Sequence, residues 1–317
     1  MSRRAKKSSW TADVKIGRSP KLGEPLYNLD HFTDAGMQTW DVYARAVRDF
    51  HYALFFELEG QRAARQKEIR AALQSVEPIR VPIDEWCRIA NFKYALTALS
   101  PAGSLTHVGG RFNFGRDIDE ARFAPFPALY IAEDFETAYR EYYGLSKGAT
   151  AAGLTPEELS LEKQGSIAVL KLVGCVSNVF DLTAVSNLNG LCRILSRFTL
   201  SNRVKSLERE MRRLENPPRA ATTIVTTPRQ LMTSVMLENW NAWPVHFDVP
   251  SNSQVLATMV IDAGFEGILY PSAKDGKNCL AIFTRTMKHS ESRVALHPDR
   301  PANIEFAEIN ADNCLAI

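Results

Sequence analysis

The chain has 317 residues, of which 45% are hydrophobic and 23% are charged, and this composition is that of an ordinary globular protein with one large or two small domains. Its formal net charge of +2 gives no reason to expect direct binding to nucleic acid or to an anionic membrane. No apolar run approaches the roughly 18 residues that a membrane-spanning helix needs. The basic N-terminus is followed by no apolar stretch, so we expect no secretory signal and a cytoplasmic location.

Several common kinds of site are missing from the sequence. The 5 cysteines form no C-x-x-C pair and the 6 histidines show no metal-ligand spacing, so we expect reduced thiols and no metal cofactor. There is no G-x-G-x-x-G, phosphate-loop or G-x-S-x-G motif. These absences argue against Rossmann, P-loop and α/β-hydrolase chemistry.

The first part of the chain predicts an arm followed by helix. Residues 1–30 are rich in charge, Gly and Pro and show little periodicity, which is typical of a loose arm. From Met37 to about Ser75 apolar residues recur every three or four positions, which predicts one long helix or two helices broken near Gly60. We expect its aromatic face to pack on its own domain, with a partner surface as the alternative.

The main domain is expected to begin at the break marked by Pro78 and Pro82. Residues 84–89 then read as a strand that contains Arg88 among apolar neighbours. Arginine is rarely buried unless it is paired or binds an anion, so Arg88 is either a ligand-binding residue or an exposed residue of an edge strand. Residues 100–127 hold too many glycines and prolines for a regular element.

Residues 128–144 form the clearest strand and helix of the sequence. Residues 128–132 are a short apolar run that predicts a buried strand, Glu133 or Asp134 suits a helix start, and Gly144 suits its end. Glu141 lies too far along this helix to interact with the positive end of its dipole. Its position among tyrosines therefore has no evident structural reason and marks it as a candidate functional carboxylate.

The remaining residues alternate between strands and helices. We expect strands at 166–173, 176–182, 266–270 and 279–284, and helices at 191–198, 204–214, 228–240 and 251–263, with a short helix inside the loop 146–165. The basic stretch 203–213 is interleaved with glutamates and predicts a solvated helix face, with nucleic-acid contact as the less favoured alternative.

Two further stretches carry candidate binding residues. In Gly109-Gly-Arg-Phe-Asn113 the two glycines allow a tight turn and close approach to a ligand, while Arg111 can grip a phosphate with two hydrogen bonds. The stretch 267–272 is a strand that runs through Tyr270 into a Pro-Ser turn, where Ser272 can meet the ends of neighbouring strands. The sequence around Ser272 is that of a poor acyl nucleophile.

Taken in order, four stretches resemble the RES-domain family, which is named for its Arg, Glu and Ser. The stretches are Trp86-Cys-Arg-Ile89, Gly109-Gly-Arg-Phe-Asn113, the run from Leu129 to Glu141, and Gly267-Ile-Leu-Tyr-Pro-Ser-Ala273. The resemblance covers roughly residues 80–288. It implies an α+β fold with an ADP-ribosyltransferase-like core of two small packed β-sheets and peripheral helices.

On this resemblance the chain divides into three parts. Residues 1–80 are the N-terminal arm and helical extension, 81–290 the RES domain with a helical insertion at about 185–245, and 291–317 a C-terminal tail. The extension is read as an antitoxin-docking face, a built-in neutraliser or extra core.

The resemblance also implies a function. RES domains act as toxins that cleave the nicotinamide–ribose bond of NAD, their substrate, by hydrolysis or phosphorolysis, and many are paired with an Xre-type antitoxin. Glu141 would be the central catalytic group, with Arg88 and Ser272 beside it. NAD would be held by Arg88, Arg111, Asn113, Tyr130 and Tyr270.

Two alternatives stay open. The first is a protein mono-ADP-ribosyltransferase that uses the same NAD pocket. The second is an inactive RES-fold module that binds or regulates a partner. A homo-oligomer is compatible with the sequence, and we expect neither direct nucleic-acid binding nor membrane insertion.

Overall fold

The computed structural model describes residues 34–145, 166–215, 221–300, 303–304 and 306–315, so the predicted arm and the short helix predicted within 146–165 lie outside the described residues. The chain divides into two compact units. One joins the segment that ends at Gly60 to Thr199–Thr223, and the other joins Gln61–Phe198 to Ile224–Ile317. Among the described residues no helix is long and apolar enough to cross a membrane.

The first unit contains most of helix α1, Asp34–Ala64, and helix α6, Asn202–Arg213. Ser201 caps α6 by accepting a hydrogen bond from the backbone of Val204 at 3.3 Å, and its own hydroxyl donates to Glu57 on α1. The Tyr43 hydroxyl donates to Glu215 at 3.1 Å. Side-chain hydrogen bonds therefore join the two helices of this unit.

The predicted helix break near Gly60 is displaced. Gly60 lies inside α1, and the break falls at Arg65, whose φ of −116° and ψ of 19° are not helical. Helix α2, Gln66–Gln74, then buries Ile69 and Leu73 in the second unit. Glycine permits a break without forcing one, so the apolar side chains that α2 has to bury decide where the helix turns.

The described strands of the second unit belong to one sheet and are accompanied by several helices, so the predicted α+β class is confirmed. The sheet has 7 strands in the order β1-β2-β5-β4-β3-β6-β7. The strands are β1 Ile79–Asn91, β2 Leu129–Ala132, β3 Ile167–Asp181, β4 Gly267–Pro271, β5 Asn278–Ile282, β6 Arg293–Leu296 and β7 Glu308–Ile309. The last two lie beyond the strands that the sequence predicted, since each is too short to give a periodic signal.

Strand β3 is long enough to close part of this sheet on itself. It pairs antiparallel with β1 over most of its length, and its end pairs in parallel with β4 through Val179 and Asp181. Because β1 also meets β2 at Cys87 and Ala132, the strands β1, β2, β5, β4 and β3 form a closed circuit of pairings. The two small sheets implied by the resemblance are thus joined here through hydrogen bonds.

Gly174 explains why two predicted strands are one. The sequence suggested a break there, yet β3 runs through Gly174 with a φ of +134°. A Cβ atom at this position would lie 2.0 Å from the carbonyl oxygen of Arg293 on β6. The glycine therefore lets the neighbouring strand approach and leaves β3 unbroken.

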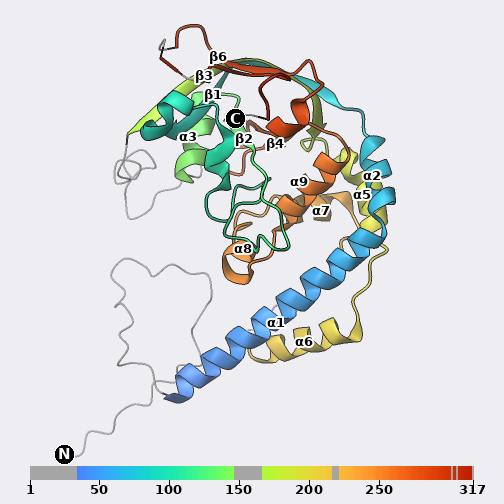
Figure 1. Ribbon diagram of the computed structural model, residues 1–317. Helices are drawn as coiled ribbons and strands as arrows, with labels where there is room; N and C mark the ends of the chain where they lie inside the picture. The colour runs from blue at the N-terminus through green and yellow to red at the C-terminus, as the bar shows by residue number, and fades with distance from the viewer. Residues whose placement is uncertain (1–33, 146–165, 216–220, 301–302, 305, 316–317) are drawn as a thin grey trace, which may run out of the picture. The chain divides into compact units, whose positions relative to one another are not determined.

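The helices of the second unit pack at different parts of the sheet (Figure 1). Helix α3, Phe135–Tyr143, packs against β1 and β2, while α9, Asn252–Asp262, packs against β4. Four helices form a group of contacting helices: α2, α5 (Asn189–Leu195), α7 (Pro228–Val235) and α9. Helix α8 is Ala242–Phe247. The predicted helix 228–240 ends at Val235, and the turn that follows it forms a wall of the site. Short 3₁₀ helices are η2 Phe92–Thr97, η3 Pro101–Leu105, η4 Val185–Leu188 and η5 Thr284–Met287.

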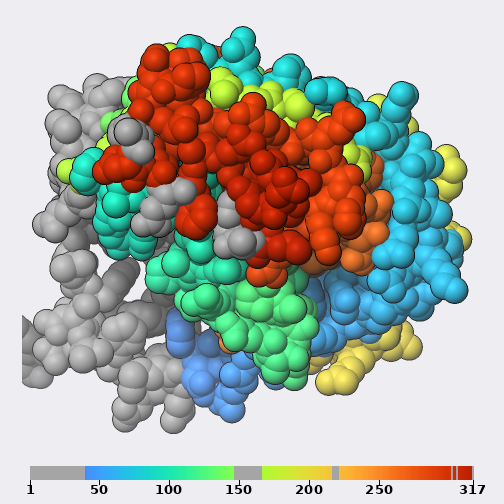
Figure 2. Space-filling view, turned by 45° about the horizontal axis from the view of Figure 1, so that its top comes forward, coloured from blue at the N-terminus to red at the C-terminus, as the bar shows by residue number. Residues whose placement is uncertain are grey.

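The core of this unit lies inside the curved sheet. Leu129, Leu172, Val176, Val179 and Leu280 from three strands are fully buried there. Figure 2 shows the same mixing on one surface, where the cyan segment that includes β1, the lime segment of β3 and the red C-terminal residues lie side by side. Residues distant in sequence are thus brought together by strand pairing.

Candidate functional site

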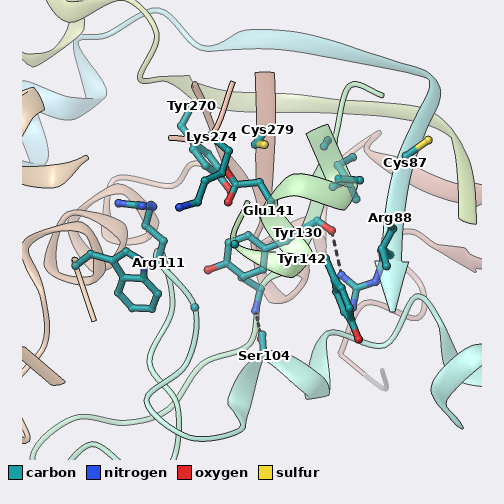
Figure 3. A pocket seen from close by; sticks show the side chains of 18 of the residues that line it. Cys87, Arg88, Ser104, Arg111, Tyr130, Glu141, Tyr142, Tyr270, Lys274 and Cys279 are labelled. Atoms are coloured by element: carbon teal, nitrogen blue, oxygen red, sulfur yellow. Dashed lines mark hydrogen bonds between the residues drawn. The ribbon is translucent and has the colours of Figure 1, made fainter. Parts of the chain in front are cut away.

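A cavity of about 470 Å³ opens at the C-terminal half of β1, beside β2 and α3 (Figure 3). Its volume is within the usual range for a small-molecule site. Among the residues that line it are five predicted ones and three that the sequence did not single out as site residues: Arg88, Arg111, Tyr130, Glu141 and Tyr270, and Glu238, Trp240 and Lys274. Residues from all four stretches that resemble the RES-domain pattern therefore line the same cavity.

Glu141 is presented to the cavity by α3. The helix begins at Asp134, whose side chain accepts a hydrogen bond from the backbone of Thr137 at 2.8 Å, and it ends at Gly144 in the left-handed conformation with φ 72°. Both ends agree with the sequence prediction. The Glu141 carboxylate accepts a hydrogen bond from the Ser272 hydroxyl at 2.5 Å.

Ser272 lies behind Glu141 and is 5% exposed. Besides donating to Glu141, its hydroxyl oxygen accepts a hydrogen bond from the backbone of Lys274 at 3.0 Å. These two bonds fix the direction of the hydroxyl proton toward the carboxylate. The geometry therefore gives Ser272 a means of orienting Glu141.

The turn that carries Ser272 is joined to the start of α3. Lys277 forms an ion pair with Asp134, and the Thr137 hydroxyl donates to Asp275 at 2.9 Å. Burial raises the pKa of Asp134, but hydrogen bonds from Lys277 and Thr137 outweigh it and hold that pKa below its ordinary value. These contacts hold the turn that carries Ser272 against the helix that carries Glu141.

Arg88 lies on β1 just after a bulge at Glu85, where φ is +54°. Its guanidinium donates to the carbonyl oxygens of Tyr130 at 3.1 Å and Ser100 at 3.4 Å, and its Nε atom is buried without a hydrogen-bond partner among the described residues. Burial lowers its pKa to about 10, so the group stays positive at neutral pH. Arg88 is therefore a fixed positive charge in the cavity wall.

The turn at Gly109–Asn113 is held tightly against Tyr130. Gly109 has a φ of +88°, and a Cβ atom on Gly110 would lie 2.5 Å from the Tyr130 hydroxyl. That hydroxyl accepts a hydrogen bond from the backbone of Phe112 and donates to Asn113, both at 2.9 Å. Tyr130 thus lines the cavity and also fixes the turn that carries Arg111.

Asn113 is not in the cavity. It is fully buried, and its amide group donates to the carbonyl oxygens of Ser104 at 2.8 Å and Phe126 at 3.1 Å. Its side-chain oxygen accepts from Tyr130 and from the backbone of Gly110. The motif placed Asn113 beside Arg111, but all of these bonds are internal, so the residue supports the turn from behind.

Arg111 reaches the cavity from this turn. One of its terminal nitrogens donates to the carbonyl oxygen of Leu237 at 2.8 Å, and its guanidinium lies 5.8 Å from the ring centre of Trp240. Burial lowers the pKa of Arg111. In Figure 3 Arg111 and Arg88 lie on opposite sides of Tyr130 and Glu141.

Tyr270 closes the wall behind Glu141. It is 5% exposed, and its ring centre lies 4.8 Å from that of Phe112. Burial raises the pKa values of Tyr270, Tyr130 and the nearby Cys279 well above their ordinary values. All three groups stay protonated at neutral pH, so they give the cavity polar surface without charge.

Gln254 is a supporting residue whose role could not be predicted from the sequence. It is fully buried on α9, and its amide donates to the carbonyl oxygens of Val108 at 2.9 Å, Gly110 at 3.1 Å and Asn113 at 2.9 Å. Its side-chain oxygen accepts from the backbone of Ser251 at 3.0 Å in the capping box of α9. Only the capping signal is visible in the sequence, since the loop it holds is far away along the chain.

The described residues contain no group of three or more His, Cys, Asp or Glu side chains arranged to hold a metal ion. The charged side chains that line the cavity are Arg88, Arg111, Lys274, Glu141 and Glu238. Such a set suits a ligand that carries both an anionic part and a centre that develops positive charge.

Comparison with known proteins finds one family model that matches part of the chain. Residues 194–304 match the model of the RES domain. The chain therefore carries RES-domain sequence. The matched RES segment includes Tyr270, Ser272 and Lys274, while Arg88, Arg111 and Glu141 precede it.

One solved structure is similar to this RES protein, the M. tuberculosis MbcT–MbcA toxin–antitoxin complex. The similarity has a TM-score of 0.38 and 16% sequence identity, and it covers 78% of this chain and 96% of the other. No curated protein sequence matches the chain.

Proposed function

We propose that this RES protein is an NAD-consuming toxin that cleaves the nicotinamide–ribose bond in the cavity around Glu141. The observation that carries the proposal is the hydrogen bond from Ser272 to Glu141, in a cavity that also contains Arg88 and Arg111. These residues come from four separate stretches of sequence that the fold brings to one cavity.

The chemistry follows from the leaving group. When the bond between the nicotinamide nitrogen and ribose C1′ breaks, its electron pair leaves with nicotinamide, and positive charge develops on the sugar as in glycoside hydrolysis. The Glu141 carboxylate would stabilise that charge and accept a hydrogen bond from a ribose hydroxyl. Nicotinamide departs as a neutral ring, so no general acid is needed.

Water or phosphate would then complete the reaction. An oxygen of the acceptor forms the new bond to C1′, and with water one proton passes to solvent. Ser272 would keep the carboxylate aimed at the sugar, while Arg88 would supply positive charge in the wall. The roles of Arg111, Tyr130 and Tyr270 would be to bind NAD, whereas Asn113 would act only through the turn that it supports.

The central test is Glu141→Gln, which keeps the shape and the acceptor for Ser272 but removes the charge. We expect nicotinamide release from NAD to fall by at least about a hundredfold, because a preorganised charge at the reacting centre is lost. Glu136→Gln is the matched control, since Glu136 lies on the same helix and bonds to Arg140. Undiminished turnover in Glu141→Gln would refute the assignment.

The products identify the acceptor. Free ADP-ribose indicates hydrolysis, its phosphate adduct indicates phosphorolysis, and label transferred from NAD to a protein would replace this proposal with protein ADP-ribosylation. A protein that neither binds nor cleaves NAD would support the inactive module instead.

The proposal extends to the cell. A cytoplasmic RES toxin paired with an Xre-type antitoxin should arrest growth when produced alone and should be neutralised by its partner. Production of the Glu141→Gln variant should leave growth and cellular NAD unchanged. If this variant arrested growth as strongly as the unaltered protein does, toxicity would not depend on NAD consumption.

A further inference from the structure

The cavity contains a cation to which the proposed reaction gives no role. Lys274 lies two residues after Ser272, and its side chain is only 16% exposed. Its ammonium group donates to Glu238 at 3.0 Å, and Glu238 is 71% exposed. A lysine this far from solvent is paired with a carboxylate that is itself largely in water.

Lys274 and Arg111 are held by neighbouring positions of the same segment. Arg111 donates to the carbonyl oxygen of Leu237, and Lys274 donates to the side chain of the next residue, Glu238. Figure 3 shows Arg111 and Lys274 on the same side of Glu141. The turn after α7 therefore brings two cations to one end of the cavity.

Arg88 is differently placed. It lies with Tyr142 on the other side of Tyr130 in Figure 3, and its guanidinium is directed to two backbone carbonyl oxygens. An ammonium group has three donors, and the Glu238 bond engages one of them. Lys274 consequently has more freedom than Arg88 to bind an anionic ligand.

We propose that Arg111 and Lys274 form the diphosphate subsite, and that Glu238 occupies Lys274 until a diphosphate displaces it. This inference rests on the proposed function, because it takes the diphosphate from NAD. An ion pair with one partner in water is weak, so exchanging the carboxylate for a doubly charged diphosphate costs little.

The test uses variants with opposite expected effects. Lys274→Met should raise the Kd for ADP and the KM for NAD about tenfold, because a charge-assisted hydrogen bond is lost. Lys274→Arg should restore most of the affinity. Glu238→Gln should lower both constants severalfold, since it removes the competing anion. A purely structural ion pair would instead make Lys274→Met and Glu238→Gln weaken binding alike.

Lys288→Met is the control for loss of a lysine. Lys288 follows η5, is exposed and does not line the cavity. Its replacement should leave ADP affinity unchanged. Melting temperatures of all four variants establish that they are folded. ADP binding should weaken with salt in every variant, but less steeply in Lys274→Met, which has lost one of the two cations of the subsite.

Binding and turnover are measured separately, so the two proposals fail separately. If calorimetry finds the expected order of ADP affinities while NAD is not consumed, the subsite stands and the proposed function falls. If NAD is cleaved with an unchanged KM in Lys274→Met, the subsite is overturned and the proposed function stands. Adenosine, which lacks the diphosphate, should bind all variants equally; a Lys274 effect on adenosine would also overturn the inference.

Discussion

The hydroxyl of Ser272 donates to the carboxylate of Glu141 at 2.5 Å, although 131 positions separate the two residues in the chain. The bond joins a turn after β4 to the last turn of α3. It satisfies one carboxylate oxygen and leaves the other for a ligand. A carboxylate whose orientation is fixed before the substrate arrives needs less reorganisation in the transition state.

This bond predicts the effect of Ser272→Ala. We expect kcat for NAD cleavage to fall about tenfold with little change in KM, because Glu141 stays in place but loses its fixed orientation. Ser292→Ala is the control, since Ser292 is also buried and donates to a buried carboxylate, that of Glu266, away from the cavity. It should lower the melting temperature and leave kcat unchanged. Equal kcat losses in the two variants would show that the Ser272 effect is general destabilisation.

The three bonds from Gln254 predict a stability effect. Gln254→Leu should lower the free energy of unfolding by about 3 kcal/mol, because buried carbonyl oxygens of the arginine-bearing turn lose their donor. Gln230→Leu is the control, as Gln230 makes the capping box of α7 without contacting that turn. It should cost about 1 kcal/mol. Denaturant titration of both variants measures the difference, and equal losses would mean that only the cap matters.

The contacts of Asp134 predict how stability depends on pH. Its pKa in the folded protein lies below the ordinary value of 3.8, so the contribution of its charge is present at neutral pH and is lost as the pH falls through the folded pKa. Asp134→Asn keeps a cap acceptor but removes the charge. We expect the variant to be less stable by under about 1 kcal/mol at neutral pH, because the ion pair with Lys277 is partly exposed.

The difference in stability should begin to shrink as the pH falls below about 4, and it should vanish only below the folded pKa of Asp134, where both proteins carry a neutral side chain. Thermal unfolding at neutral pH and at about pH 3 measures it. A gap that is constant with pH would show that the charge of Asp134 contributes nothing to folding.

Signals that act over a few residues were readable in the sequence. Asp134 and Gly144 bound α3, and Ser251 caps α9, because caps depend on local hydrogen bonds and on glycine's backbone freedom. The apolar runs of β2 and β5 were likewise clear. The position of Glu141 past the first helical turn was the one local hint of function.

Features that depend on distant neighbours were not readable. Trp240 and Lys274 line the cavity only because the turn after α7 folds over Arg111. Asn113 sits in a motif that suggests ligand binding, but its side chain makes five internal hydrogen bonds, to Tyr130, to Gly110 and to three carbonyl oxygens. The break at Arg65 in place of Gly60 likewise reflects the packing of α2.

The closed circuit of strands has a consequence for protein synthesis. Tyr130 on β2 is paired with Ala281 on β5, and Ser272 and Lys274 lie between β4 and β5. When Glu141 has just left the ribosome, strands β4 and β5 have not yet been made. The cavity can therefore form only after residue 282 has also left the ribosome. At about 5–20 residues per second that interval is on the order of ten seconds. On the proposed function, the unfinished chain therefore has no complete site for cleaving NAD during that interval.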